Sequence, residues 1–308
     1  MSYNTIYVIS DDSSALKEFC GGAKKLASKV KAVVFGDEAY ANAAASCGAD
    51  SIIYCPVSDP SDVEGYAKAI AETIKSDASA LAIVFNDIRG RLIAGKLGVY
   101  LDAPVLTTVN TIEKDGEKLV LRRMVYGGVA QSKETIKSAY GVITMSTGIF
   151  EDYDELPATT NIKAIEGTAD TRIKLLSREE KKEATVNLAV AKRIVDVGRG
   201  LAKEEDLEMM RKLAAAIGGE VGCSRPVAEN NKWMPKACYM GITGVSVKPE
   251  LLIAIGVSGQ VQHIGGINKS KVIVCINKDK DAPIFKNSDF GLVADMYKVL
   301  PMLIEKLS

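Results

Sequence analysis

The chain has 308 residues, about twice the length of a typical domain, so length alone predicts two domains with a core each. Hydrophobic residues make up 47% of the chain and charged residues 25%, the balance of a globular protein, which excludes general disorder. Lys plus Arg and Asp plus Glu each number 39, so no net charge indicates nucleic acid or an anionic membrane as a partner.

The N-terminal run MSYNTIYVISDD lacks the basic start and long apolar core of a signal peptide. No apolar run approaches the roughly 20 residues that cross a bilayer, so membrane insertion is not expected. Six cysteines show no CxxC pair and no nearby histidine, so zinc and iron–sulfur spacings are absent: Cys20, Cys47, Cys55, Cys223, Cys238 and Cys275. We therefore expect a cytoplasmic protein whose thiols are buried in a reducing compartment.

In the first half, short β-rich runs alternate with helical patterns, which predicts a parallel sheet with helices on both faces. The expected strands are TIYVIS (5–10), AVVFG (32–36), SIIYC (51–55) and ALAIVF (80–85), and the expected helices span 14–30, 38–47 and 62–76. The fold class expected for this half is therefore α/β.

The pattern changes after residue 104. Three β-rich runs follow one another there: VLTTVNTIE (105–113), KLVLRRMVY (118–126) and YGVITM (140–145). Since KDGEK (114–118) has the composition of a reversal, these runs predict an antiparallel extension.

Periodicity fades between Thr147 and Arg172, which is typical of the approach to a linker. The charged stretch LLSREEKKEATVN (175–187) is then expected to close the first domain as an edge strand. We place the boundary near residue 185, giving an N-terminal α/β domain over 1–185 and a second domain over 186–308.

Alternation resumes in the second half and predicts another doubly wound sheet. Its expected strands are RIVDVG (193–198), GEVGCS (219–224), ELLIAIGV (250–257), KVIVCIN (271–277) and FGLVAD (290–295), with helices over 203–217, after SGQVQH (258–263) and at the C-terminus. In such sheets ligands bind at the carboxyl ends of the strands. The unusual residues lie in the loops at those ends: GRG (198–200), CSRP (223–226), GVSGQ (256–260), NKDKDAP (277–283) and Asp295.

Two of these loops suit a phosphate. In GVSGQ, the Ser258 hydroxyl stands at an expected N-cap, and Gly259 would let a ligand approach free helix amides. In GRG, the Arg199 guanidinium could donate paired N–H groups to a pyrophosphate. Both patterns also occur for purely structural reasons, as a helix start and as a turn with a solvated arginine, and the GxGxxG spacing is absent.

For other polar residues the sequence allows both a ligand-binding and a structural role. Asp295 could accept from ribose hydroxyls or cap the last helix, and Asn277 is similarly ambiguous. His263, the single histidine, could donate to a flavin ring and stabilise its one-electron anionic radical, or could be a satisfied structural residue. Ser224, Arg225 and Thr243 are the other polar groups expected near a redox ring.

Hydrolytic and nucleotide-hydrolysing sites are not indicated. His263 lies in no GxSxG elbow, and the chain has no Walker loop. Paired acids such as Glu204 and Glu205 fall at an expected helix start, where a solvated cap is the simpler interpretation. No acid or base for a substrate of its own stands out, which favours a carrier over a catalyst.

Five segments of the second half carry a resemblance to a known family: VGRG (197–200), CSRP (223–226), VSGQVQHIGG (257–266), VIVCINKDKDAPIF (272–285) and DFGLVAD (289–295). In order and spacing they are similar to the alpha subunit of electron transfer flavoproteins. The first half resembles that family's N-terminal, nucleotide-binding-like domain more loosely, through VYGG (125–128). SRPVAENNKWM (224–234) further resembles a branch linked to carnitine or crotonobetaine metabolism in bacteria.

The resemblance implies FAD held by the second domain, a beta subunit completing a heterodimer, and a partner dehydrogenase of the acyl-CoA type. It places Arg199 near the phosphates, Ser224 and Arg225 along the flavin, and Thr243 at N5 of the ring. It places His263 at O2, and Asn277 and Asp295 with Met296 at the pyrophosphate and adenosine ribose. The implied cofactor-binding set is Arg199, Ser224, Arg225, Met240, Gly241, Ile242, Thr243, Ser258, Gly259, Gln260, Val261, Gln262, His263, Asn277, Asp295 and Met296.

One position departs from the family, which usually has glutamine where this chain has Ile242. An apolar side chain there leaves only backbone groups to contact the ring. The sequence thus predicts an FAD-containing electron carrier. A nicotinamide-dependent dehydrogenase using the same loops is the alternative, and a nucleotide-sensing or scaffolding protein is a third hypothesis.

Overall fold

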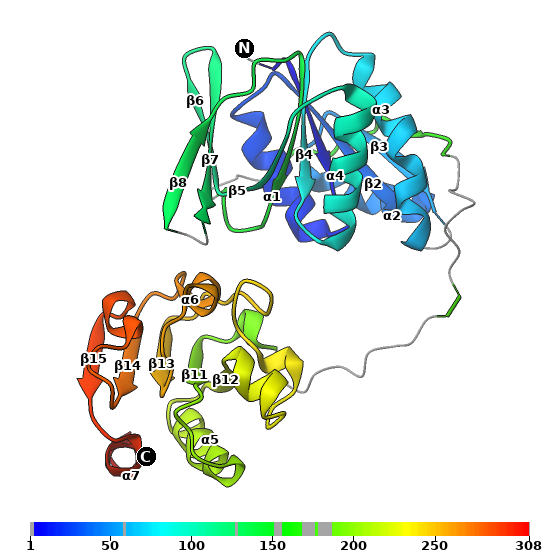
Figure 1. The fold of residues 1–308 in the computed structure, drawn as a ribbon. Helices are drawn as coiled ribbons and strands as arrows, with labels where there is room; N and C mark the ends of the chain where they lie inside the picture. Colours follow the sequence, from blue (N-terminus) through cyan, green and yellow to red (C-terminus); the bar gives the residue numbers. More distant parts are fainter. Residues whose placement is uncertain are drawn as a thin grey trace. The chain divides into compact units, whose positions relative to one another are not determined.

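The computed structural model describes residues 3–57, 60–126, 129–150, 156–167, 176–177 and 187–307. The chain divides into two compact units, Met1–Arg178 and Glu179–Ser308, which are described separately (Figure 1). The edge strand expected over 175–187 lies almost entirely outside the described residues, as do the expected boundary near 185 and the glycines of VYGG. Those expectations remain predictions.

The first unit is built on a seven-stranded sheet in the order β10-β3-β2-β1-β4-β9-β5, with every pairing parallel. Its strands are β1 (Thr5–Ile9), β2 (Lys29–Gly36), β3 (Ser51–Pro56), β4 (Ala80–Phe85), β5 (Val105–Val109), β9 (Tyr140–Met145) and β10 (Ile162–Ala164). The expected α/β class of this half is therefore confirmed.

Helices cover both faces of this sheet because successive strand side chains point to opposite faces. In β1, Ile6 and Val8 pack with α1, whereas Tyr7 and Ile9 pack with α3 and α4. The helices are α1 (Ser13–Lys24), α2 (Glu38–Ala43), α3 (Ala67–Lys75) and α4 (Ile88–Leu101). The sequence expectations did not include α4, although Asp87 caps it by accepting from the Gly90 amide at 2.6 Å.

The antiparallel extension forms a separate three-stranded sheet, β6 (Thr111–Asp115), β7 (Lys118–Val125) and β8 (Ala130–Glu134). Its first reversal lies where KDGEK predicted it, with Asp115 paired to Lys118 and Gly116 at φ 60°. The expected composition of the extension was wrong, because β5 and β9 belong to the parallel sheet. The run from residue 105 to 113 is broken at Asn110, between β5 and β6, and β5 itself is irregular, with Thr108 at a φ of 56°.

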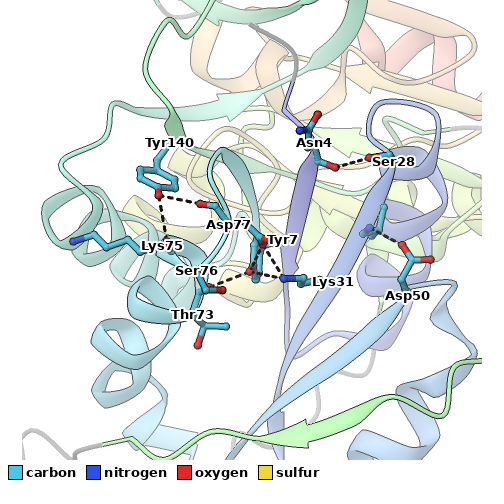
Figure 2. Close-up of polar contacts among 11 residues, drawn as sticks. Asn4, Tyr7, Ser28, Lys31, Asp50, Thr73, Lys75, Ser76, Asp77 and Tyr140 are labelled. Carbon is cyan, nitrogen blue, oxygen red and sulfur yellow. Dashed lines mark hydrogen bonds and ion pairs between the residues drawn. The ribbon is translucent and has the colours of Figure 1, made fainter.

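A polar cluster fastens α3 to the amino-terminal edge of the first sheet (Figure 2). The Tyr7 hydroxyl donates to Asp77 Oδ2 at 2.7 Å, and Lys31 Nζ lies 2.8 Å from the same oxygen. The Tyr140 hydroxyl donates to the Asp77 carbonyl at 3.0 Å. Because the polar groups of this cluster are hydrogen-bonded to one another, we assign it a structural role. It lies away from the carboxyl edge of the sheet, where ligands bind.

The second unit is built on a five-stranded parallel sheet in the order β12-β11-β13-β14-β15. Its elements are β11 (Arg193–Val197), α5 (Leu207–Ala216), β12 (Glu220–Cys223), β13 (Leu251–Ile255), α6 (Val261–Ile267), β14 (Ile273–Asn277), β15 (Phe290–Val293) and α7 (Met296–Leu307). This is the doubly wound fold that the sequence predicted. Within the described residues, no helix is both long and apolar enough to span a membrane.

Candidate functional site

A cavity of about 780 Å³ opens at the carboxyl edge of the second sheet. The chain leaves β11 for β12 on one side and continues through β13 on the other, so the sheet has its topological switch point beside β11. Loops after β11, β12, β13 and β14 line the cavity, through Arg199, Gly200, Ser224, Arg225, Pro226, Tyr239, Ile242, Thr243, Gly256, Val257, Ser258, Gln260, Gln262, His263, Asn277, Lys278, Asp279, Ala282 and Pro283.

The structure thus brings together ten of the sixteen site residues expected from the sequence. These are Arg199, Ser224, Arg225, Ile242, Thr243, Ser258, Gln260, Gln262, His263 and Asn277. The other six, Met240, Gly241, Gly259, Val261, Asp295 and Met296, are not among the lining residues. Contact of any of them with a cofactor remains a prediction.

The glycines of these loops serve contacts between loops. A Cβ on Gly198 would lie 2.1 Å from the Gly256 carbonyl oxygen, so only glycine lets the loops after β11 and β13 touch. Gly259 has a φ of 84°, and a Cβ there would lie 2.3 Å from the Ile284 nitrogen. Gly259 therefore lets the loop after β13 pass close to the backbone at Ile284, and its expected role in ligand approach stays a prediction.

Helix α6 also begins later in the chain than the expected N-cap at Ser258 implies. The N-cap of α6 is Gln260, not Ser258, and the Ser258 carbonyl accepts from the Ile284 amide at 3.1 Å. The Ser258 side chain is consequently exposed at the cavity wall. The amides of Val261 and Gln262 precede the first intrahelical hydrogen bonds of α6, and such groups can donate to an anion.

Two lining side chains have unused hydrogen-bonding capacity. The Arg199 guanidinium is exposed and makes no hydrogen bond or ion pair with any part of the chain that the structure describes. Ser224 is 8% exposed, and its buried hydroxyl has no hydrogen-bond partner among the residues that the structure describes. Since buried polar groups are almost always paired, the Ser224 hydroxyl is placed for a ligand atom.

Arg225 is held by an acidic partner on the next turn. Its Nε lies 2.5 Å from Glu229 Oε2, across the short π-helix Pro226–Asn230. Lys236 Nζ approaches the other Glu229 oxygen at 3.6 Å. The hydrogen bond from Arg225 lowers the pKa of Glu229, so this carboxyl stays charged beside the cavity mouth.

Thr243 has a partner that the sequence analysis missed. Its hydroxyl lies 2.7 Å from the Tyr239 hydroxyl, and both residues line the cavity. Ile242 between them is 55% exposed, and its amide donates to the Gln262 carbonyl at 2.8 Å. The apolar side chain that departs from the family therefore stands at the wall, while its backbone fixes the loop to α6.

His263 is buried between two protein groups. Its Nε2 lies 2.6 Å from Asp196 Oδ2, and its Nδ1 lies 3.0 Å from the Met240 carbonyl oxygen. Burial lowers the pKa of His263, but the charge and hydrogen bond of Asp196, with the Met240 carbonyl, together raise it above its ordinary value. Asp196 was missed by the sequence analysis because it stands inside the apolar run RIVDV.

The remaining expected residues have local roles. Asp295 caps α7, since its Oδ1 accepts from the Tyr297 amide at 3.0 Å. Capping of the last helix was one of the two roles that the sequence predicted for it. Asn277 donates to the Val257 carbonyl at 2.8 Å and accepts from the Asp279 amide at 3.0 Å, tying the loops after β13 and β14 together. Met296 is buried against Gly200 and Gly256, in the loops after β11 and β13.

The first unit has a much smaller cavity at the carboxyl edge of its own sheet. This cavity, lined by Ile9, Ser10 and Asp87 among others, has a volume of about 10 Å³. That is room for about one water molecule. A nucleotide does not fit there, so the nucleotide-binding likeness of this unit lies in its fold.

The fold and the large cavity together define the class: a doubly wound protein whose switch-point cavity is built for a dinucleotide. Residues 13–181 match the family model of the electron transfer flavoprotein domain, and residues 187–268 match that of the electron transfer flavoprotein FAD-binding domain.

Known proteins are similar to this chain along its whole length. It is 38% identical to Protein FixB of Salmonella typhimurium over 311 residues, covering 99% of both chains. Protein FixB of Escherichia coli O157:H7 and of Shigella flexneri are each 38% identical over 312 residues, covering 100% of this chain and 99% of theirs. The chain belongs to the electron transfer flavoprotein alpha subunit family, and FAD is its cofactor.

The residues present suit FAD. The cavity is within the usual range for ligand sites, about 300–1,000 Å³, and its lining mixes apolar residues with many polar and charged ones. An unpaired guanidinium suits phosphates, and the unpartnered Ser224 hydroxyl suits a polar ring or chain atom. Bound FAD supplies reversible electron transfer, which side chains alone do not provide.

Proposed function

We propose that this chain pairs with an electron transfer flavoprotein beta subunit, accepts electrons from a dehydrogenase of the acyl-CoA type, and passes them to another redox protein. The observation that carries the proposal is the cavity itself, where four strand-end loops of one sheet meet. Within the family shown above, such a cavity is where FAD would be held.

The charged groups divide the cavity into two regions. Arg199 and Lys278 supply positive charge on the loops after β11 and β14, where we place the phosphates. Ser224, Thr243 and His263 lie on the remaining loops and on α6, where we place the ring. In this assignment the amides of Val261 and Gln262, at the start of α6, assist Arg199 with the pyrophosphate.

Electron carriage without a diffusible substrate is part of the proposal. Among the cavity's ionisable groups, Arg225 is paired with Glu229 and His263 with Asp196, and Arg199 is suited to phosphate. The Asp279 carboxylate accepts from the Asp281 amide at 3.0 Å within its own loop. A catalytic acid or base would need an ionisable group poised toward a substrate. The described lining offers no further group placed in that way, which supports a carrier.

Two finer assignments belong to the proposal as well. A link to carnitine-type acyl-CoA metabolism rests on the SRPVAENNKWM segment alone. A cytoplasmic location rests on the cysteines, which are all buried free thiols, as expected in a reducing compartment.

Coexpression with a beta subunit tests the proposal. We expect a yellow heterodimer that retains FAD on gel filtration, is bleached by dithionite and regains its absorbance on oxidation. The same sample should show no tight NAD(H) binding, which the alternative dehydrogenase hypothesis requires. A complex that stays colourless after reconstitution with FAD, or a flavin that cannot be cycled, would rule the carrier function out.

A further inference from the structure

Asp196 occupies an unusual position for a carboxylate. It is the penultimate residue of β11, between the apolar residues Val195 and Val197, and is 0% exposed. Its Oδ2 contacts His263, while its Oδ1 is buried with no hydrogen-bond partner among the described residues. A buried carboxylate needs a compensating charge or donor, because isolated burial of the ion is strongly unfavourable.

The neighbours of Asp196 in the sheet are small. In the register of the sheet, Asp196 lies beside Gly222 of β12 and Ala254 of β13. Side chains in register share a face of the sheet, and the space beside Gly222 is taken by Met240, whose Cε would lie 2.7 Å from a Cβ there. The His263 ring of α6 contacts the Asp196 side chain, with 7% of its surface exposed.

The hydrogen bonds of His263 fix its protons. A carbonyl oxygen only accepts, so the contact with the Met240 carbonyl requires a proton on Nδ1. The Nε2 contact with Asp196 then holds a second proton, because two lone pairs would repel at 2.6 Å. The charge and hydrogen bond of Asp196 raise the pKa of His263 despite its burial, so this second proton belongs on the ring.

We infer that Asp196 is a positioning residue for the flavin site: it holds His263 as a doubly protonated imidazolium whose two N–H groups both point into the protein. The flavin would then lie beside a buried ion pair at the cavity wall. Because Asp196 and the Met240 carbonyl accept both N–H groups of His263, the pair would act on the flavin through its electric field and not through a hydrogen bond. The link to the flavin rests on the proposed function, whereas the protonation of the pair does not.

Other ionisable groups near the pair do not replace Asp196. Burial raises the pKa of the Cys223 thiol of β12, and the charge of Asp196 raises it further, so this thiol stays neutral. Arg199, Arg225 and Lys278 line the same cavity and are cations, so their charge opposes a second proton on His263. Among the described residues in contact with the ring, the Asp196 carboxylate and the Met240 carbonyl favour it, and Asp196 alone of these two carries a charge.

A chain with a single histidine allows a direct test. The full chain labelled with ¹⁵N-histidine, free and joined to unlabelled beta subunit, gives one imidazole to follow by NMR as pH is raised. In the wild-type chain we expect two ring protons to persist above pH 6.5, the ordinary histidine pKa. In Asp196→Asn the Nε2 proton should be lost at a pH at least about one unit below that of the wild type, which is a tenfold fall in proton affinity. Asp281→Asn, which changes the same charge at an exposed loop position, should match the wild-type chain.

The wild-type chain alone can overturn the inference. A single ring proton at neutral pH would do so, as would an Asp196→Asn ring that titrates like the wild type. In the FAD-loaded heterodimer, the midpoint potential of Asp196→Asn should show a break at the new histidine midpoint, and the wild type should not. A heterodimer that never binds FAD would contradict the proposed function. The NMR result would still decide whether Asp196 holds His263 doubly protonated.

Discussion

Gly259→Ala tests how the second unit shapes its cavity. Gly259 lies in the loop between β13 and α6, with a φ of 84° that L-residues rarely adopt. A Cβ there would meet the Ile284 nitrogen at 2.3 Å and the Ile284 Cα at 2.5 Å. Because those are backbone atoms, no change of rotamer relieves the overlap, and one of the two loops must move.

The expected cost follows from these distances. The left-handed conformation costs an alanine about 1–2 kcal/mol, and overpacking against backbone adds about 1–3 kcal/mol. The total of about 2–5 kcal/mol appears as lost stability or, where the loop relaxes, as weaker FAD binding. If about 2 kcal/mol is borne by binding, FAD affinity falls about 30-fold.

Two assays together detect the effect: FAD dissociation from the heterodimer, and denaturant unfolding of the same sample. Gly95→Ala is the matched control, since a Cβ there meets nothing within 4 Å in the exposed face of α4. It should leave FAD binding unchanged and stabilise the chain by up to about 1 kcal/mol. Wild-type unfolding and wild-type FAD affinity in Gly259→Ala would refute the loop contact as described.

Three further predictions concern the cavity wall. Arg199→Ala should lower FAD retention more than it shifts the flavin potential, because its guanidinium is assigned to the phosphates; equilibrium dialysis beside a redox titration compares the two, and a larger shift in potential would contradict the assignment. Tyr239→Phe removes the hydroxyl partner of Thr243 and should change FAD binding by about 0.5–1.5 kcal/mol; an unaltered affinity and potential would show that the pair has no role in the site. The raised pKa of His263 stabilises the fold fully below about pH 6.5, and this contribution is lost as pH rises through the folded pKa; the wild type should therefore exceed His263→Gln in unfolding free energy most at acidic pH, and a difference that grows with pH would have the wrong sign.

The arrangement of the second unit could be predicted well because its signals are local. Each buried strand is a short apolar run, and each is followed by a loop with glycine or charged residues. Parallel strands bring those loops to one edge, so Arg199, Ser224 and His263 were expected together. The first unit was harder, since the β5 and β9 runs look like hairpin strands until their partners far along the chain are known.

The partners of the site residues could not be predicted, because they depend on register and on contacts between distant segments. Asp196 and His263 are 67 residues apart and meet only when α6 packs over β11. The close contact of Gly259 with Ile284 could not be predicted either, because the chain gives no local sign that Ile284 lies beside it. The pairing of Tyr239 with Thr243 was within reach, since four residues separate them in one loop.

A crystal structure of the FAD-loaded heterodimer tests the central claim most directly. We predict density for the whole cofactor in the cavity between the loops after β11, β12, β13 and β14, with the His263 ring beside the isoalloxazine and still bonded to Asp196. Cofactor density elsewhere on the chain, or a His263 ring remote from the flavin, would contradict this account.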